Sequence, residues 1–519
     1  MVGKRFVFFL TLGSALLVSS NSYAQKPEQK SHKKEFVRTH KDVITDGTVT
    51  VGGQRIDYKA IAGNIYLKND KNDTTATIFY VAYVKSDVKD ESKRPVTFLY
   101  NGGPGSSTLW LHMGSFGPRR AETSDTAHVK PAPYKLVNNE YSLLDASDLV
   151  FIDAPGTGFS RLDGASKAKD FYGVDQDGHA FAQFITRFLS KYDRWNSPKY
   201  LFGESYGTTR SAVLSRYLET EDNVDLNGVI LLSQILSYDI SNDDDPYHNP
   251  GMDLTYELAL PTYTATAWYH HKLPNQPSGL QPLLKEAERF ATTDYAQALM
   301  QGSDLSQPAK QQTAEKLHQY TGLPVDYIMK ANLRISGGEF THELLNSDDQ
   351  STGRLDTRFD GPSMDPLGKE ASYDPQASAI SSAYVSLFNH YIREDLHYGK
   401  GMTYKPEISL WRTWDYLHAQ PDSHMKLPEA TNVMPDLAWA MKYNPHLKVM
   451  LNSGYFDLAT PYYAAVYTMK HLPIPDKLQK NIEYKFYDSG HMAYVHPESL
   501  KKLHNNVARF IRDTDNVSD

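Results

Sequence analysis

Short runs of β-branched and aromatic residues, separated by glycines, follow one another from about residue 48 onwards. This pattern predicts strands at residues 49–51, 55–58, 64–67, 77–84 and 96–100. We expect Gly52, Gly53 and Gly63 to break the first three of these strands apart. The last strand leads into residues 101–105, a run of asparagine, glycine and proline that is typical of a loop.

After residue 148, apolar runs alternate with amphipathic stretches. Further strands are predicted at residues 149–152, 200–202, 229–232, 448–451 and 484–486. Helices are predicted at residues 175–192, 460–471 and 497–512. Strands that alternate with helices predict a mainly parallel sheet that is covered by helices on both faces.

Residues 238–373 interrupt this alternation. Helical periodicity dominates there, and stretches rich in polar residues, proline and glycine, such as 241–246 and 347–366, separate the helices. We interpret this part as a helical insertion that forms a cap over the active edge of the sheet. The core would then consist of residues 48–237 and residues 374–519.

Residues 1–24 have the layout of a secretory signal peptide. A basic start precedes an apolar run at residues 6–17, which is too short to span a bilayer. We expect cleavage after Ala24, followed by a flexible polar leader at residues 25–47. An uncleaved membrane anchor is the alternative.

The composition narrows the class of protein. The chain has no cysteine, which excludes disulfides, a thiolate nucleophile and a cysteine-ligated zinc. An exported protein of 519 residues without disulfides fits a bacterial periplasm better than an animal or plant secretory pathway. The net charge of -8, with both signs scattered, argues against nucleic acid as a partner. The acidic runs at residues 175–178 and 243–245 lack the ligand spacing of a calcium loop, so we expect no metal.

Residues 203–207 read Gly-Glu-Ser-Tyr-Gly, the G-x-S-x-G pattern, between a predicted strand and a predicted helix. The glycines permit a sharp turn that lifts the hydroxyl of Ser205 out of the sheet. A serine nucleophile needs a base, and the base needs a carboxylate to orient it. In α/β-hydrolases the acid and then the histidine follow the serine along the chain. Asp457 and His491 each lie in a loop after a predicted strand, so we expect them to complete a catalytic triad; His496 is the rival base.

The glycines at residues 101–105 suit a second task. They allow backbone N–H groups to point at a developing negative charge, which is worth about 3–4 kcal/mol per donor. The N–H groups of Gly103 and of Tyr206, directly after the serine, are the natural pair for this oxyanion hole.

These segments together resemble the signature blocks of the serine carboxypeptidase family, which has the α/β-hydrolase fold. The matching blocks are residues 101–107, 151–155, 158–160, 203–206 and 490–492 with Pro497. The resemblance extends from about residue 96 to the C-terminus and is poor in the insertion.

The resemblance implies that Asn101, Gly102 and Glu204 bind the free C-terminal carboxylate of a peptide substrate. A carboxylic acid next to a carboxylate is a good partner only if one of the two carries a proton. We therefore expect peptides to bind best at acidic pH. The family needs no cofactor.

The chain also departs from the family pattern. Tyr100 replaces the usual tryptophan, and Ser106 replaces a cysteine, so we expect packing alone to hold this loop. Around the acid, the family often has Gly-Asp-x-Asp, whereas residues 454–457 of this chain read Gly-Tyr-Phe-Asp. After the nucleophile, Thr208 and Thr209 replace the usual Ala-Gly. These changes indicate a divergent bacterial member.

The expected function is a serine carboxypeptidase that releases C-terminal residues from peptides through an acyl-enzyme intermediate. The same triad could instead serve an esterase or an acyltransferase. A third alternative is a hydrolase fold that binds ligands without catalysis.

Overall fold

The computed structural model describes residues 41–517 apart from 165, 242–249, 424 and 427. The predicted signal peptide and most of the predicted leader lie outside the described residues. Among the helices that are described, none is long and apolar enough to cross a membrane.

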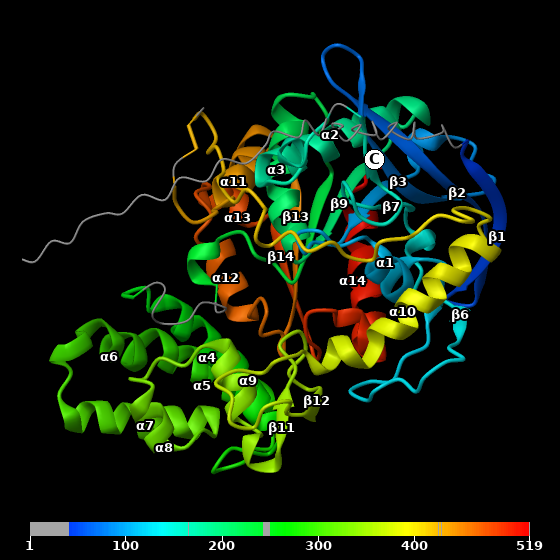
Figure 1. The fold of residues 1–519 in the computed structure, drawn as a ribbon. Helices are drawn as coiled ribbons and strands as arrows, with labels where there is room; N and C mark the ends of the chain where they lie inside the picture. Colours follow the sequence, from blue (N-terminus) through cyan, green and yellow to red (C-terminus); the bar gives the residue numbers. More distant parts are fainter. Residues whose placement is uncertain (1–40, 165, 242–249, 424, 427, 518–519) are drawn as a thin grey trace, which may run out of the picture. The chain divides into compact units, whose positions relative to one another are not determined.

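One large mixed sheet organises the described residues (Figure 1). Its strands are β1 (Val43–Val51), β2 (Gln54–Lys68), β3 (Thr74–Lys85), β4 (Val96–Tyr100), β7 (Asp148–Ile152), β8 (Arg161–Leu162), β9 (Lys199–Glu204), β10 (Gly228–Leu232), β13 (Lys448–Gly454) and β14 (Ile482–Tyr487). They lie in the order β1-β2-β3-β7-β4-β9-β10-β13-β14, and β8 pairs with β3. Neighbours from β7 to β14 are parallel, whereas β1, β2, β3 and β7 pair antiparallel.

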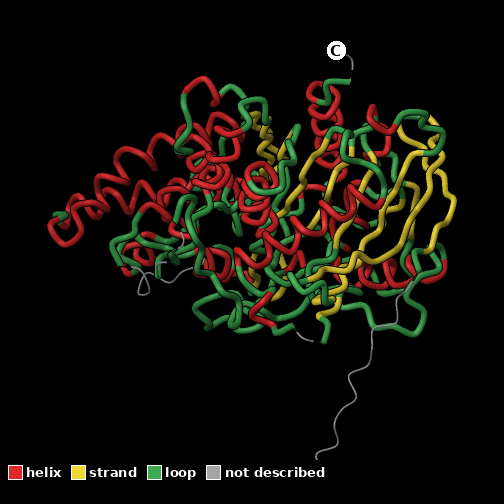
Figure 2. Tube along the Cα trace, turned by 90° about the horizontal axis from the view of Figure 1, so that it is seen from above, coloured by secondary structure: helices red, strands yellow, loops and turns green. Residues whose placement is uncertain are grey.

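Helices cover both faces of this sheet (Figure 2). One face carries α2 (Val174–Lys191), α3 (Tyr206–Thr220), α11 (Met434–Tyr443) and α12 (Tyr462–Lys470). The other face carries α1 (Leu109–Leu111), the π-helical turn η2 (His112–Phe116), α10 (Pro375–Glu394) and α14 (Pro497–Thr514). Successive side chains of β4 point to opposite faces of the sheet. Phe98 packs on the face covered by α2 and α3, and Leu99 packs on the face covered by α10 and α14. A strand buried on both faces is mostly apolar, which is why the central strands consist largely of apolar residues.

A group of helices lies between β10 and α10. It contains α4 (Leu254–Tyr269), α5 (Leu280–Phe290), α6 (Ala296–Gln301), α7 (Gln307–Thr321), α8 (Val325–Lys330) and α9 (Gly337–Glu343), followed by the hairpin of β11 (Gln350–Thr352) and β12 (Asp360–Pro362). These helices have an apolar core of their own, in which the rings of Tyr263 and Phe340 stack at 4.0 Å. Leu458, from the loop after β13, is part of that core and links it to the sheet.

The remaining elements are short. A second small hairpin pairs β5 (Arg119–Ala121) with β6 (Leu136–Asn138), and α13 (Asp476–Gln479) precedes β14. The helical turns are η1 (Glu91–Lys93), η3 (Leu143–Asp145), η4 (Ala168–Asp170), η5 (Tyr238–Ile240), η6 (Ala291–Tyr295), η7 (Gly302–Asp304), η8 (Asn346–Asp348) and η9 (Ala493–Val495).

The first strands differ from the prediction in two ways. β1 begins at Val43, within the segment predicted to be a flexible leader. Gly52 and Gly53 form the expected turn with φ of 55° and 81°, but β2 runs unbroken through Gly63. A Cβ at Gly63 would lie 2.2 Å from Oδ1 of Asp42, so this glycine provides room for a neighbour and does not end a strand.

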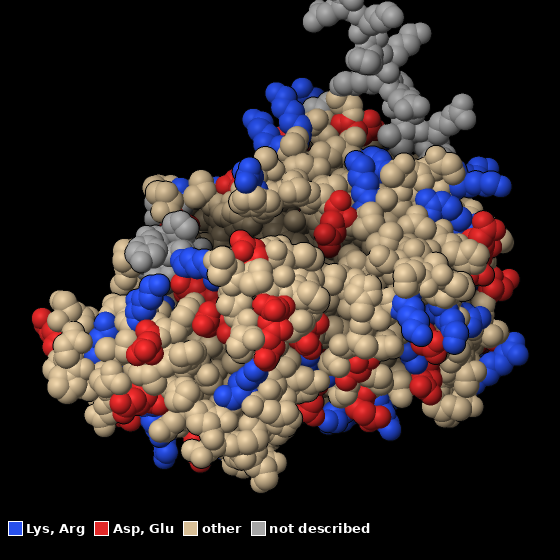
Figure 3. Space-filling model, turned by 60° about the horizontal axis from the view of Figure 1, so that its bottom comes forward, with Lys and Arg blue, Asp and Glu red and all other residues tan. Residues whose placement is uncertain are grey.

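The surface charges are mixed. Figure 3 shows basic and acidic side chains interspersed over one face of the molecule. This arrangement fits the small excess of 62 acidic over 54 basic residues in the chain.

Candidate active site

Ser205 occupies a sharp turn between β9 and α3. Its backbone has φ of 61° and ψ of -130°, a strained conformation for a residue with a side chain. The turn requires glycine on both sides, because a Cβ at Gly203 would lie 2.2 Å from the carbonyl oxygen of Gly207. A Cβ at Gly207 would in turn lie 2.9 Å from the carbonyl oxygen of Tyr100. The local sequence therefore raises the Ser205 hydroxyl at the carboxyl end of the sheet.

Asp457 and His491 lie in the loops after β13 and β14 and contact each other. Nδ1 of His491 is 2.9 Å from Oδ2 of Asp457, so its N–H donates to the carboxylate. Thr460 donates to the same carboxylate through its hydroxyl at 2.7 Å and through its backbone N–H at 2.9 Å. Asp457 is fully buried, and these donors fix its orientation.

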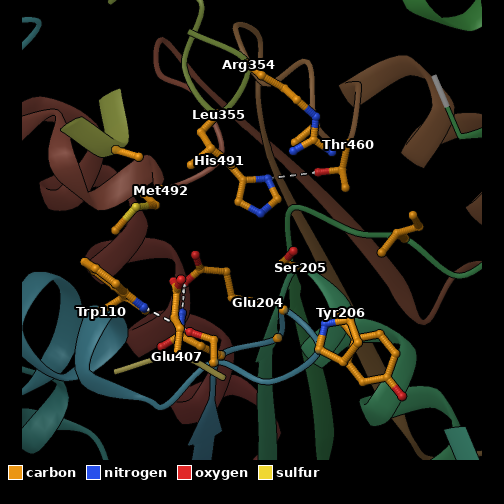
Figure 4. A pocket seen from close by; sticks show the side chains of 18 of the residues that line it. Trp110, Glu204, Ser205, Tyr206, Arg354, Leu355, Glu407, Thr460, His491 and Met492 are labelled. Atoms are coloured by element: carbon orange, nitrogen blue, oxygen red, sulfur yellow. Dashed lines mark hydrogen bonds between the residues drawn. The ribbon is translucent and has the colours of Figure 1, made fainter. Parts of the chain in front are cut away.

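The pKa of His491 is raised from its ordinary value. Burial opposes the charged imidazole, but the charge of Asp457, its hydrogen bond and the charge of Glu204 outweigh that effect. Ser205 and His491 line the same cavity, and their side chains face each other in Figure 4. Among the described residues no hydrogen bond joins the Ser205 hydroxyl to the His491 imidazole. In enzymes without substrate this contact is often longer than a hydrogen bond and shortens when substrate binds.

The loop at residues 102–103 lies directly against the start of α3. A Cβ at Gly102 would be 2.4 Å from the backbone nitrogen of Tyr206. Tyr206 is the first residue of α3, so its N–H has no partner within the helix. Gly103 has φ of 103°, which favours glycine. Both candidate oxyanion donors thus belong to segments that pack backbone to backbone.

A buried arginine holds this loop to the helices. Arg210 of α3 donates to the carbonyl oxygen of Asn101 at 2.8 Å and pairs with Asp177 of α2 at 2.6 Å. Asp177 belongs to the acidic run at residues 175–178, and its carboxylate serves this ion pair. Asp175, from the same run, accepts from Lys426 at 3.0 Å.

Asn101 and Glu204 form a second buried group beside the triad. The Asn101 amide donates to Oε2 of Glu204 at 2.9 Å, and the hydroxyl of Tyr494 donates to the same oxygen at 2.9 Å. Burial raises the pKa of Glu204 to about 7, while His491, Tyr494 and Asn101 each partly offset the effect. Glu204 is therefore half protonated near neutral pH, which is unusual for a carboxyl group.

The expectation that packing alone holds the loop around Ser106 is wrong. The backbone of this loop pairs with residues 405–408: Ser107 donates to the carbonyl oxygen of Pro406 at 2.9 Å, and Ile408 donates to that of Gly105 at 2.8 Å. The Ser106 hydroxyl accepts from the indole N–H of Trp110 at 3.0 Å. Hydrogen bonds thus hold the loop where the family has a cysteine.

These groups open into one cavity of about 350 Å³. Besides the residues already discussed, its walls include Ile235, Tyr238, Arg354, Leu355, Ile380, Glu407, Tyr416 and Met492. The rival base, His496, instead makes a hydrogen bond of 2.8 Å with Ser499 at the start of α14.

Several residues of the site escaped the sequence analysis. Tyr494 contacts Glu204, 290 positions away in the chain, only through the fold. Thr460 lies three residues after Asp457, but nothing in the local sequence marks it as a partner of that carboxylate. Residues 353–359, which join β11 to β12, reach the site from the insertion. A single sequence carries no signal for the contacts of Tyr494 and of residues 353–359, because these contacts join segments that lie far apart in the chain.

Comparison with known proteins adds an independent line of evidence. A family model described as serine carboxypeptidase matches residues 53–506. The pheromone-processing carboxypeptidase KEX1 of Phytophthora infestans is 29% identical over 175 residues, which are 31% of this chain and 26% of that protein. The carboxypeptidase Y homolog of Arthroderma benhamiae is 30% identical over 167 residues, 32% of this chain and 30% of that protein. The aligned part of the chain thus covers about a quarter to a third of these relatives.

A solved structure shows the same architecture. The crystal structure of a prohormone-processing carboxypeptidase, Kex1(Δ)p from Saccharomyces cerevisiae, matches with a TM-score of 0.53 and 16% identity, over 88% of this chain and 92% of that one. The predicted α/β-hydrolase fold is therefore confirmed. The family match spans the sheet from β2 to β14, together with the segments of Ser205, Asp457 and His491, and the chain belongs to the serine carboxypeptidase family.

Proposed function

We propose that the protein is a serine carboxypeptidase, which removes the last residue from peptides that have a free C-terminus. One observation carries this proposal: Glu204, with a pKa of about 7, lies with Asn101 in the same cavity as Ser205 and His491. A protonated carboxyl and an amide are suitable donors to a substrate carboxylate. Their position next to the serine suits cleavage of the bond that precedes the last residue.

The reaction proceeds in two halves. His491 takes the hydroxyl proton of Ser205 through Nε2, and the serine oxygen attacks the carbonyl carbon of the last peptide bond. The oxyanion is bound by the N–H groups of Gly103 and Tyr206. His491 then gives its proton to the leaving amine as the C–N bond breaks, and the C-terminal amino acid departs. Asp457 stabilises the imidazolium and keeps Nδ1 protonated.

Water completes the cycle. His491 removes a proton from a water molecule, whose oxygen attacks the ester of the acyl-enzyme. Collapse of the second oxyanion releases the shortened peptide, and the proton returns from His491 to Ser205.

Recognition of the C-terminus predicts a pH-dependent KM. As pH rises through the Glu204 pKa of about 7, Glu204 loses the proton that it shares with the substrate carboxylate, and the two anions repel. We expect KM for a blocked dipeptide to rise about tenfold from pH 6 to pH 8. In Glu204→Gln the amide donates at every pH, so KM should change less than about twofold over that range. Equal slopes for both proteins would refute this role of Glu204.

The test of the proposed function compares a peptide with its C-terminal amide. A carboxypeptidase that recognises the free carboxylate should cleave the acid at least about a hundredfold faster, because the amide has no negative charge and its NH2 group cannot accept from the donors of Asn101 and Glu204. Equal rates would favour the esterase or acyltransferase alternative. Failure of a fluorophosphonate to label Ser205 would favour the non-catalytic binding protein.

Two further proposals concern the insertion and the location of the protein. The helices from α4 to α9 support a cap role for residues 238–373, since their core includes Leu458 beside the acid. We further propose export to a bacterial periplasm, on the pattern of residues 1–24 and the absence of cysteine.

A further inference from the structure

The loop that joins β11 to β12, residues 353–359, contacts both loops that carry the acid and the base. We call it the insertion loop, because it belongs to the predicted insertion at residues 238–373. The carbonyl oxygen of Arg354 accepts from the N–H groups of Leu458 and Ala459, each at 3.1 Å. The carbonyl oxygen of Leu355 accepts from the N–H of His491 itself at 2.6 Å.

Asp356 is the charged residue of this contact. Its Oδ2 accepts from the backbone N–H of Gly490, directly before His491, at 3.0 Å. The same carboxylate pairs with Arg358 at 2.6 Å, and both side chains are almost completely buried. Arg358 also reaches Asp125 at 3.1 Å and the hydroxyl of Ser489 at 3.5 Å.

The base loop is shaped to receive the insertion loop. A Cβ at Gly490 would lie 2.3 Å from the carbonyl oxygen of Leu355 and 2.5 Å from Cα of Asp356. A Cβ at Gly454 would lie 2.1 Å from the carbonyl oxygen of Ser489. The acid strand, the base loop and the insertion loop therefore form three layers of backbone in direct contact.

We infer that Asp356, with Arg358, is a positioning residue that holds the imidazole of His491 in register with Ser205 and Asp457. This inference rests on the proposed function, since it takes His491 as the base. The buried ion pair keeps the Asp356 carboxylate in one orientation, and the carboxylate keeps the Gly490 N–H and the ring that follows it in place. The insertion thereby supplies part of the catalytic geometry in addition to covering the site.

The test measures how fast a fluorophosphonate labels Ser205, since labelling needs an aligned base but no peptide binding. In Asp356→Asn we expect labelling to slow by about tenfold to a hundredfold, because displacement of a catalytic group by about 1 Å has effects of that size. On a peptide substrate kcat should fall in parallel, while KM stays within about twofold, because Asn101, Glu204 and Tyr494 are untouched.

Asp253→Asn is the matched control. Asp253 forms a similar forked pair with Arg334, at 2.6 Å and 2.7 Å, within the same insertion but away from the base loop. Its labelling should equal that of the wild type. Arg358→Lys keeps the charge and loses the fork, so we expect an intermediate rate.

Two results would overturn the inference: labelling of folded Asp356→Asn at the wild-type rate, or equal slowing in Asp253→Asn. If Asp356→Asn does not fold, Arg358→Lys decides, and a wild-type rate in that variant counts against the inference. A wild type that reacts with the probe but cuts no peptide would contradict the proposed function alone, and the labelling series would still test Asp356.

Discussion

Replacing Ser205 with alanine is expected to lower kcat for peptide hydrolysis by about 10⁶-fold, because the substitution removes the atom that forms the acyl-enzyme. The cavity and the group of Asn101, Glu204 and Tyr494 are unchanged, so peptide should still bind with nearly the wild-type affinity. Rates are measured by release of the C-terminal amino acid, and affinity by calorimetry with the uncleaved peptide.

Ser215→Ala provides the control for this variant. Ser215 is a buried serine of α3 whose hydroxyl donates only to the carbonyl oxygen of Ala212, at 2.8 Å, and we expect its activity to stay within about twofold of wild type. If the Ser205→Ala variant retained more than about a hundredth of the wild-type rate, a residue other than Ser205 would have to be the nucleophile.

Asp457→Asn is expected to lower kcat by about 10⁴-fold. Asparagine has one acceptor oxygen where Asp457 has two. If that oxygen accepts from the backbone N–H of Thr460, as Oδ1 of Asp457 does, the amide NH2 faces Nδ1 of His491 and favours the wrong tautomer for taking the serine proton. KM should change little, because Asp457 lies behind the imidazole and is fully buried.

Asp488→Asn is the matched control for this substitution. Asp488 lies in the same loop as His491, but its side chain is 54% exposed and pairs with Lys502 at 3.3 Å. Exposed ion pairs of this kind contribute little to the stability of the fold, so the activity of Asp488→Asn should stay near the wild-type value. A similar loss in both variants would mean that any change in this region disturbs the loop.

Local patterns were sufficient to predict most of the core. The apolar runs that form β4, β9 and β10 are buried on both faces. Such a strand can be predicted from its own sequence, without knowing which strands pair with it. The error at Gly63 arose because a glycine in a strand can mark a turn or a close contact, and the sequence does not distinguish the two. Only the position of Asp42 in the fold reveals which applies.

Only those site residues could be predicted whose order along the chain and position after a strand are typical of their catalytic role. Ser205, Asp457 and His491 could be named because each comes directly after a strand of the same parallel sheet. Tyr494 and Asp356 could not, because their roles depend on which segments the fold brings together. Ser106 illustrates the same limit: its hydroxyl bonds to Trp110 four residues away, but its loop is held by residues 405–408.

Mass spectrometry of a synthetic peptide with distinct residues at both ends tests the central claim most directly. If the hydroxyl of Ser205, the imidazole of His491 and the group around Glu204 act together, the products will form a ladder shortened one residue at a time from the C-terminus. Cleavage at internal bonds, or loss of residues from the N-terminus, would contradict that claim.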